Sequence, residues 1–510
     1  MTISLKTLTQ AALAGFACLL LLVFGYAWLW TGNTGLLSTQ GLMVTAESLV
    51  LCMLLVSYCN RSQLGLVAYF LLLMGIYYWL PIINLIVFPD NFLRGNPLSF
   101  WLKPGDVDAA LGFIAVAFPL SLLVLMACQR RSALGSLMIF RSPETAIRIY
   151  WGATILMLES SAVDMYRYLV VGQGRFGEGA SGGWNWIFYL ISEFQLACII
   201  FFAAAVSAWP LIGKKGKLIF AITLSSYVVT RALTGSKGSI FEVFIFGIGA
   251  FLLTSDIDRI KVKLLGMLLA SAIVLLPLSF VVGFVTRSVT FGGELRSEAI
   301  DVEDIYTQGV KTYGDQEDIF SPINMARRMA GRVNALDVLV LIIHKGTDTK
   351  LDFWDTVPKA IVNLLMPGDP FENILASSRL FMVEYDGQSE ETAFRIYHTD
   401  LWYLYGVFIP FVGVAGALIL VALALWAFAS WYYHTFRLQE RWRFYSVVSM
   451  FYCFYWFIVN LGVDEWVGIV GKATVNLLFF VAAMHVFEKW VPRKLLLASS
   501  NRHQSATAGA

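Results

Sequence analysis

Charged residues are scarce in this chain, and their scarcity argues against a water-soluble fold. Only 14% of the 510 residues are Asp, Glu, Lys or Arg, whereas 58% are hydrophobic. Soluble domains carry about 25% charged residues. A soluble domain of this length has too little interior to hide so much apolar surface, so we expect lipid to surround most of the chain.

Cysteine pairs and cofactor motifs are also lacking. Every cysteine lies in or beside a long apolar run: Cys18, Cys52, Cys59, Cys128, Cys198 and Cys453. Residues 287–399 contain none, which predicts no disulfide framework there. The sequence has no Walker A loop, no GxGxxG after a strand, no HExxH and no Cys/His metal spacing, so we expect neither a cofactor nor a metal. A net charge of +2 gives no reason to expect nucleic acid.

Long apolar runs dominate what is present. A helix needs about 20 apolar residues to cross the hydrocarbon core of a bilayer. Such runs predict an all-α polytopic membrane protein with about 12 transmembrane helices. We place the spans at 9–31, 41–59, 64–88, 107–128, 148–171, 184–208, 217–233, 238–254, 263–286, 400–432, 443–462 and 466–487.

The distribution of Lys and Arg predicts the orientation of these helices. If the N-terminus is inside, basic residues are several times more frequent in the inner segments than in the short outer loops. The positive-inside rule then favours a multi-pass protein of the bacterial inner membrane with both termini cytoplasmic. The predicted organisation is helices over 1–286, a large periplasmic loop over 287–399, helices over 400–487 and a cytoplasmic tail over 488–510.

The periplasmic loop is predicted to be partly helical. A helix start at Ser321 and Pro322 precedes apolar residues at helical spacing from Met325 to Val340, which indicates an amphipathic helix on the membrane surface or on the bundle. The loop has 11 Lys and Arg against 18 Asp and Glu, yet its arginines cluster locally. A cluster within an acidic loop favours a specific anion site, because guanidinium forks suit phosphate. The alternative is an ordinary interfacial helix face. The candidates are Arg327, Arg328, Arg332 and Arg395.

Ionisable residues within the spans are the second candidate constellation. A charge near the centre of a membrane helix costs at least ~2.5–3.5 kcal/mol on insertion scales, so it usually faces a partner or a wet cavity. Either interpretation is open here: pairs that lock helix packing, or a charged cavity near the outer leaflet. The Gly-rich turn around Arg231 and Lys237 favours phosphate binding. The intramembrane candidates are Glu159, Asp164, Arg167, Glu193, Arg231, Lys237, Glu242 and Lys472.

A histidine lies where the loop re-enters the membrane. His398 is close in sequence to Arg395, Asp400 and Tyr403. Because its pKa is ordinarily near neutral, His398 is a candidate general base, although a single histidine is often structural. Asp400 and Asp337 are the alternative bases.

Two stretches resemble the Wzy-type O-antigen polymerase and O-antigen ligase superfamily. They are SSYVVTRALTGSKGSIFEVFIFGIGAFLL and HTDLWYLYGVFIPFVGVAGAL. The family usually carries Arg where this chain has Lys237. The loop runs GRVNALDVLVLIIHKG and DTVPKAIVNLLMPGDP are similar to oligosaccharide repeat-unit polymerases.

This resemblance implies a GT-C-like, metal-independent glycosyltransferase. Such enzymes act at the periplasmic face on undecaprenyl-diphosphate-linked glycans and take no nucleotide sugar. Loop arginines bind the diphosphate in the family, which implies that role for Arg327, Arg328, Arg332 and Arg395, and for Arg231. A chain-length regulator and a flippase are the expected partners, besides the lipid bilayer. A ligase and a lipid-linked glycan transporter are the alternatives.

Overall fold

The computed structural model describes most of the apolar chain. Besides the main ranges given next, the structure describes residues 358–359, 361–362, 371, 383–385 and 389. The main described ranges are 2–89, 104–127, 139–140, 142–169, 194–233, 239–254, 259–261, 335–347, 403–459 and 462–490. The predicted span 263–286, residues 491–510 of the predicted tail and most of the predicted loop lie outside these ranges.

The N-terminal helices form one group of the bundle. Side-chain caps begin the first two helices: Ser4 Oγ accepts from the Thr7 amide at 3.0 Å, and Ser38 Oγ accepts from the Gly41 amide at 2.9 Å. α1 packs against α2, and α2 packs against α5. This group contains α1 (Leu5–Tyr26), η1 (Ala27–Thr31), α2 (Thr39–Tyr58), α3 (Arg61–Met74), η2 (Gly75–Trp79), α4 (Leu80–Val87) and α5 (Pro104–Ala127).

A π-helical segment interrupts the predicted span 64–88. Pro81 has no amide hydrogen, and its ring would clash with a carbonyl one turn earlier in a regular helix. The chain accommodates this residue with η2, in which the Leu80 amide bonds to the Gly75 carbonyl. The segment therefore stays helical through Pro81 and buries Tyr77, Tyr78 and Trp79.

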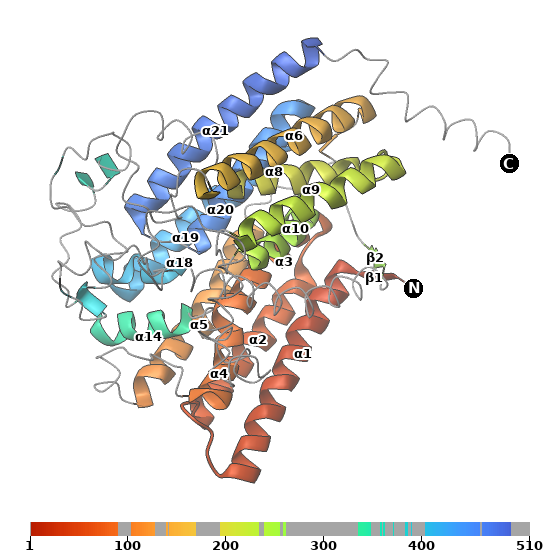
Figure 1. The fold of residues 1–510 in the computed structure, drawn as a ribbon. Coiled ribbons are helices and arrows are strands. Elements are labelled where there is room, and N and C mark those ends of the chain that lie inside the picture. Colours follow the sequence, from red (N-terminus) through yellow and green to blue (C-terminus); the bar gives the residue numbers. More distant parts are fainter. Residues whose placement is uncertain are drawn as a thin grey trace, which may run out of the picture.

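The central helices form a second group beside the first (Figure 1). α6 packs against α8 and α9, and α10 packs against α8. α10 also approaches α3 closely, since a Cβ on Gly65 would clash with the Leu252 carbonyl oxygen. Small residues allow membrane helices such close backbone contact. The group contains α6 (Pro143–Leu169), α8 (Phe194–Ala208), α9 (Lys214–Leu233) and α10 (Ser239–Thr254).

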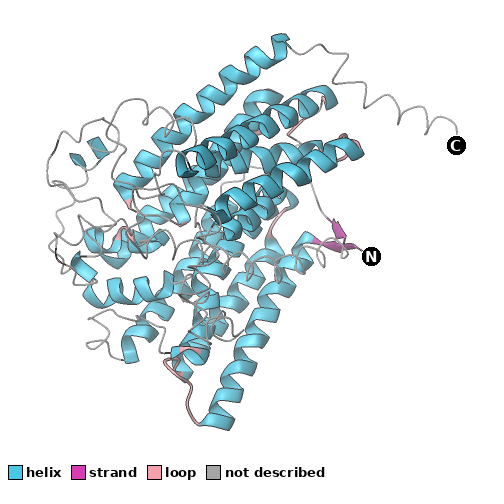
Figure 2. Cartoon of the chain, viewed as in Figure 1, coloured by secondary structure: helices cyan, strands magenta, loops and turns pink. Residues whose placement is uncertain are grey.

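The C-terminal helices differ from prediction at their start. The single helix predicted over 400–432 is broken, because Gly406 ends a short helix and Gly413 is non-helical with φ 70° and ψ 177°. Figure 2 shows helices throughout the described chain apart from one strand pair. The C-terminal group contains α18 (Tyr403–Gly406), α19 (Ile409–Thr435), α20 (Glu440–Ile458) and α21 (Val463–Trp490).

The chain is a multi-pass helical membrane protein. Of the described helices, six are long and apolar enough to cross a bilayer. Two shorter apolar helices, Gln195–Ala208 and Phe241–Thr254, accompany them. Every predicted span except 263–286 overlaps a described helix, although residues 184–193 and 400–402 of two predicted spans lie outside the described residues, and the total of 12 crossings stays a prediction. The six are Leu5–Thr31, Thr39–Tyr58, Arg61–Val87, Gly105–Ala127, Ile409–Thr435 and Trp466–Val486.

Contacts between the segments that connect the helices identify the two ends of the bundle. β1 (Thr2–Ser4) pairs antiparallel with β2 (Arg259–Lys261), so two segments predicted to be cytoplasmic lie together. At the other end the Leu36 amide bonds to the Leu85 carbonyl at 2.9 Å. We call these the inner and outer ends, following the predicted orientation.

One helix of the large loop packs on the bundle at the outer end. α14 (Ala335–Lys345) contacts α5, α18 and α19 and buries residues including Leu336 and Val340. This agrees with the C-terminal part of the predicted amphipathic helix. Its predicted N-terminal part, with the loop arginines, lies outside the described residues.

Candidate functional site

The structure describes two of the predicted site residues, and they lie in different helix groups. Arg231 belongs to α9, which packs against α6 and α10. Asp337 belongs to α14, which packs against α5, α18 and α19. The other predicted site residues lie outside the described ranges: His398, Asp400, Arg327, Arg328, Arg332, Arg395 and Lys237.

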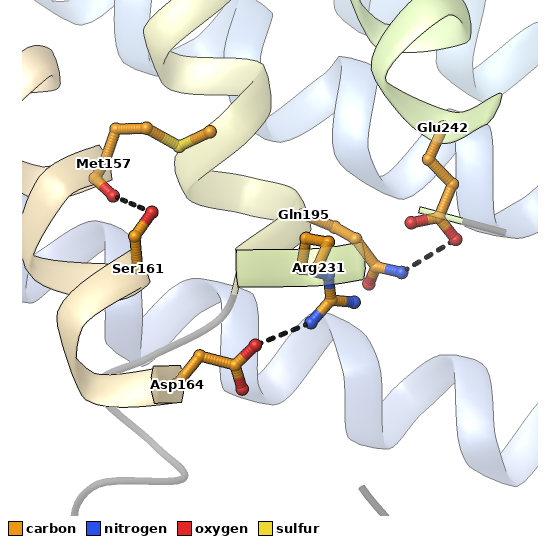
Figure 3. A network of polar contacts seen from close by, with 6 residues as sticks. All are labelled: Met157, Ser161, Asp164, Gln195, Arg231 and Glu242. Atoms are coloured by element: carbon orange, nitrogen blue, oxygen red, sulfur yellow. Dashed lines mark hydrogen bonds and ion pairs between the residues drawn. The ribbon is translucent and has the colours of Figure 1, made fainter. Parts of the chain in front are cut away.

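Arg231 is buried and forms an ion pair. It lies in the last turn of α9 and is 5% exposed. Its Nη1 atom is 3.1 Å from Oδ2 of Asp164 on α6 (Figure 3). Asp164 comes just after Ser161, whose hydroxyl donates to the Met157 carbonyl at 2.8 Å within the same helix. The pair therefore joins the outer ends of α6 and α9.

A second carboxylate lies on α10. Glu242 is in the first turn of α10, and its Oε1 atom accepts a 3.1 Å hydrogen bond from Nε2 of Gln195 on α8 (Figure 3). Its Oε2 atom is buried and has no hydrogen-bond partner within the described residues. The negative side chain is favourably placed, because the N-terminus of a helix carries a partial positive charge.

These four side chains form one polar cluster, which we call the outer-end cluster: Asp164, Gln195, Arg231 and Glu242. Each comes from a different helix, and each lies at the end of its helix that faces the 170–193 or 234–238 connection. Both connections are predicted to be periplasmic. Ionisable groups within membrane helices are costly and usually serve a pathway or a binding site.

Buried side chains with polar atoms lie deeper in the bundle, beyond the cluster. Tyr227, one turn before Arg231 on α9, is fully buried, and so is Cys198 on α8. Tyr77 of η2 and Tyr455 of α20 are also buried. The bundle interior therefore contains phenol and thiol groups as well as apolar side chains.

Comparisons with known proteins add no relative. No family model, curated protein or solved structure matches this chain. The established description is therefore a multi-pass helical membrane protein, and the case for a function depends on its own residues.

Asp337 lies on a second polar surface, around α14. It is 3% exposed in the first turn of that helix, where the helix dipole favours a carboxylate. Buried Tyr405 of α18 lies 2.6 Å, oxygen to oxygen, from Ser121 of α5. This hydrogen bond joins α18 to α5, two of the helices against which α14 packs.

One histidine–carboxylate contact and one ion pair hold the C-terminal end of α14. His344 Nδ1 is 3.1 Å from Asp106 Oδ1 of α5, and Lys345 Nζ is 2.6 Å from Glu384 Oε2. The Lys345 ammonium also lies 5.1 Å from the ring centre of Tyr385. Burial raises the pKa of the Tyr385 hydroxyl, with Glu384 adding to the shift, so Tyr385 stays protonated at neutral pH. α14 is tied both to the bundle and to a later part of the loop.

Sequence reasoning identified some of these residues but not their partners. Asp164 and Glu242 stood out as intramembrane charges. Ion pairs that lock helix packing were one of the two interpretations of such charges that the sequence left open. Gln195 gave no signal beyond being an amide in an apolar run. His344 and Lys345 were visible only as the end of an amphipathic helix.

Proposed function

We propose that the chain is an integral-membrane glycosyltransferase that polymerises undecaprenyl-diphosphate-linked oligosaccharide repeat units. The single observation that carries the proposal is Arg231, a guanidinium 5% exposed at the outer end of an apolar bundle. Two residues separate it from the TGSKGS sequence of the segment that resembles the polymerase and ligase superfamily. A buried guanidinium beside a Gly-rich turn suits a lipid-linked phosphate group.

The proposed reaction needs little more than positioning and charge. The growing glycan, carried on one lipid diphosphate, is the donor, and the anomeric C–O bond to that diphosphate breaks. A hydroxyl oxygen of the incoming lipid-linked repeat unit forms the new C–O bond, and a base takes its proton. The diphosphate leaves with the bonding electron pair, and guanidiniums stabilise its growing negative charge. His398 is the proposed base, with Asp400 and Asp337 as alternatives.

The proposal assigns the same role to the loop arginines as to Arg231. Arg327, Arg328, Arg332, Arg395 and Lys237 would complete a diphosphate clamp, and no metal is needed for that task. The protein would work in the bacterial inner membrane beside a flippase and a chain-length regulator.

A direct experiment tests the proposed polymerase. The gene is deleted, and the chain or its variants are restored while membrane levels are checked. Arg332→Ala, Arg395→Ala and His398→Ala are each expected to abolish long surface polysaccharide on a gel, because each removes a proposed diphosphate ligand or the base. Arg296→Ala, an arginine of the same loop outside the cluster, is the matched control and should leave polymer length unchanged. Normal polymer from all three site variants would overturn the proposal.

A transporter of lipid-linked glycans is the second candidate. The buried Asp164–Arg231 ion pair within the bundle favours it, since such charges often mark transport pathways. Purified protein in vesicles separates the two functions: new glycosidic bonds indicate a polymerase, and movement of lipid-linked glycan across the bilayer without bond formation indicates a transporter. A ligase shares the donor chemistry and differs in accepting a finished chain onto another carrier.

A further inference from the structure

Glu242 has one satisfied and one unsatisfied carboxylate oxygen. Gln195 donates to Oε1 at 3.1 Å, whereas Oε2 is buried with no hydrogen-bond partner in the described part of the chain. Buried polar atoms in native proteins nearly always have partners, and each exception calls for an explanation. The unsatisfied atom therefore points to a missing ligand.

The neighbouring groups fix the Glu242 carboxylate without occupying Oε2. Gln195 orients the carboxylate by binding its other oxygen, and the start of α10 favours its negative charge. The cation of the cluster is engaged elsewhere, because Arg231 pairs with Asp164. In the view of Figure 3, the Gln195 amide lies between Arg231 and Glu242.

The chemistry of the unsatisfied atom restricts what it can bind. A carboxylate oxygen accepts hydrogen bonds and repels anions, so Oε2 suits a hydroxyl and not a diphosphate. Arg231, on the neighbouring helix, has the opposite preference. The outer-end cluster thus offers one group for a phosphate and another for a sugar.

We propose that Glu242 Oε2 binds a hydroxyl of the glycan carried by the lipid diphosphate, so that Glu242 is a sugar-binding residue. This inference rests on the proposed function, because it takes the substrate to be a lipid-linked glycan. Gln195 is then a positioning residue that holds the carboxylate in place. Neither residue takes part in proton transfer.

The experiment compares two probes on purified protein in nanodiscs. One probe is the undecaprenyl-diphosphate-linked glycan that accumulates when the gene is deleted, and the other is undecaprenyl diphosphate without sugar. Glu242→Gln should raise the Kd for the glycan lipid about 10-fold, because a charge-assisted hydrogen bond is lost, and leave the Kd for undecaprenyl diphosphate unchanged. Glu47→Gln, an exposed carboxylate of α2, is the control and should change neither Kd.

The outcomes separate this inference from the proposed function. Equal affinities of Glu242→Gln and the unaltered protein for the glycan lipid would overturn the sugar site, and so would an equal loss for both probes. If the unaltered protein forms no polymer but Glu242→Gln weakens binding of the glycan lipid alone, the polymerase is overturned and the sugar site is supported. Glu242→Asp, which keeps the charge but withdraws it by one methylene, should also weaken glycan binding and serves if Glu242→Gln is not recovered from membranes.

Discussion

Arg231 and Asp164 illustrate how membrane burial constrains single residues. Their side chains are 6% and 17% exposed, so both charges are largely buried between α6 and α9. Removing one partner leaves an uncompensated buried charge, whereas removing both charges does not. The pair therefore has a structural role that can be separated from a role in binding.

We predict that Asp164→Asn and Arg231→Gln each lower the free energy of unfolding by about 3 kcal/mol, because each leaves a buried charge without its partner. The double variant should recover part of this loss without recovering polymer formation. Thermal unfolding in detergent and polymer gels measure the two effects.

A second pair on the same helix is the control. Glu144 and Arg148 lie one turn apart at the inner end of α6, with the Glu144 side chain 39% exposed. Because the Glu144 carboxylate is well exposed, although the Arg148 side chain is only 11% exposed, Glu144→Gln should lower stability less than Asp164→Asn does. A polymer-forming double variant would remove Arg231 from the proposed site.

Two of the membrane helices depart from regular α-helical geometry along their length. The span 61–87 contains the π-helical segment η2, and α19 contains the non-helical Gly413. The φ and ψ of Gly413 belong to a region that essentially only glycine adopts. A Cβ there would lie 3.8 Å from Thr347 Cγ2, so backbone strain and not crowding limits substitution.

Gly413→Ala is expected to lower stability by roughly 1–3 kcal/mol through this strain. Gly112→Ala is the matched control, because Gly112 lies within helix α5 and no atom is within 4 Å of its added Cβ. Alanine is favoured over glycine inside a helix, so the control should be neutral or stabilising. Unfolding of both purified variants in detergent gives the comparison, and equal stability would contradict the strained backbone.

The two ends of the molecule differ in their polar contacts. The inner end carries the β1–β2 pair and a hydrogen bond from the Ser142 amide to Glu440. The outer end carries the outer-end cluster and α14. Because the predicted orientation assigns these ends to opposite sides of the membrane, it can be tested as a whole.

Reporter fusions should show both termini in the cytoplasm and the large loop in the periplasm. Alkaline phosphatase inserted after residue 315 should be active, and inserted after residue 213 it should be inactive, because the enzyme matures only in the periplasm. Green fluorescent protein after residue 510 should fluoresce. The opposite pattern would invert the positive-inside assignment.

The sequence by itself determined where the membrane helices lie. Runs of about 20 apolar residues become helices because a bilayer interior leaves no other way to satisfy the backbone. The sequence also identified Asp164, Arg231 and Glu242 as unusual, because a charged residue is costly to bury within an apolar membrane span.

Only the tertiary structure decided which residues meet. Lipid is as apolar as the neighbouring helices, so a membrane helix need not mark its packing face with a hydrophobic stripe. The pairing of Arg231 with Asp164, the contact of Gln195 with Glu242 and the break at Gly413 depend on which helices become neighbours. α14 was more predictable, because a loop helix in water must bury its apolar side.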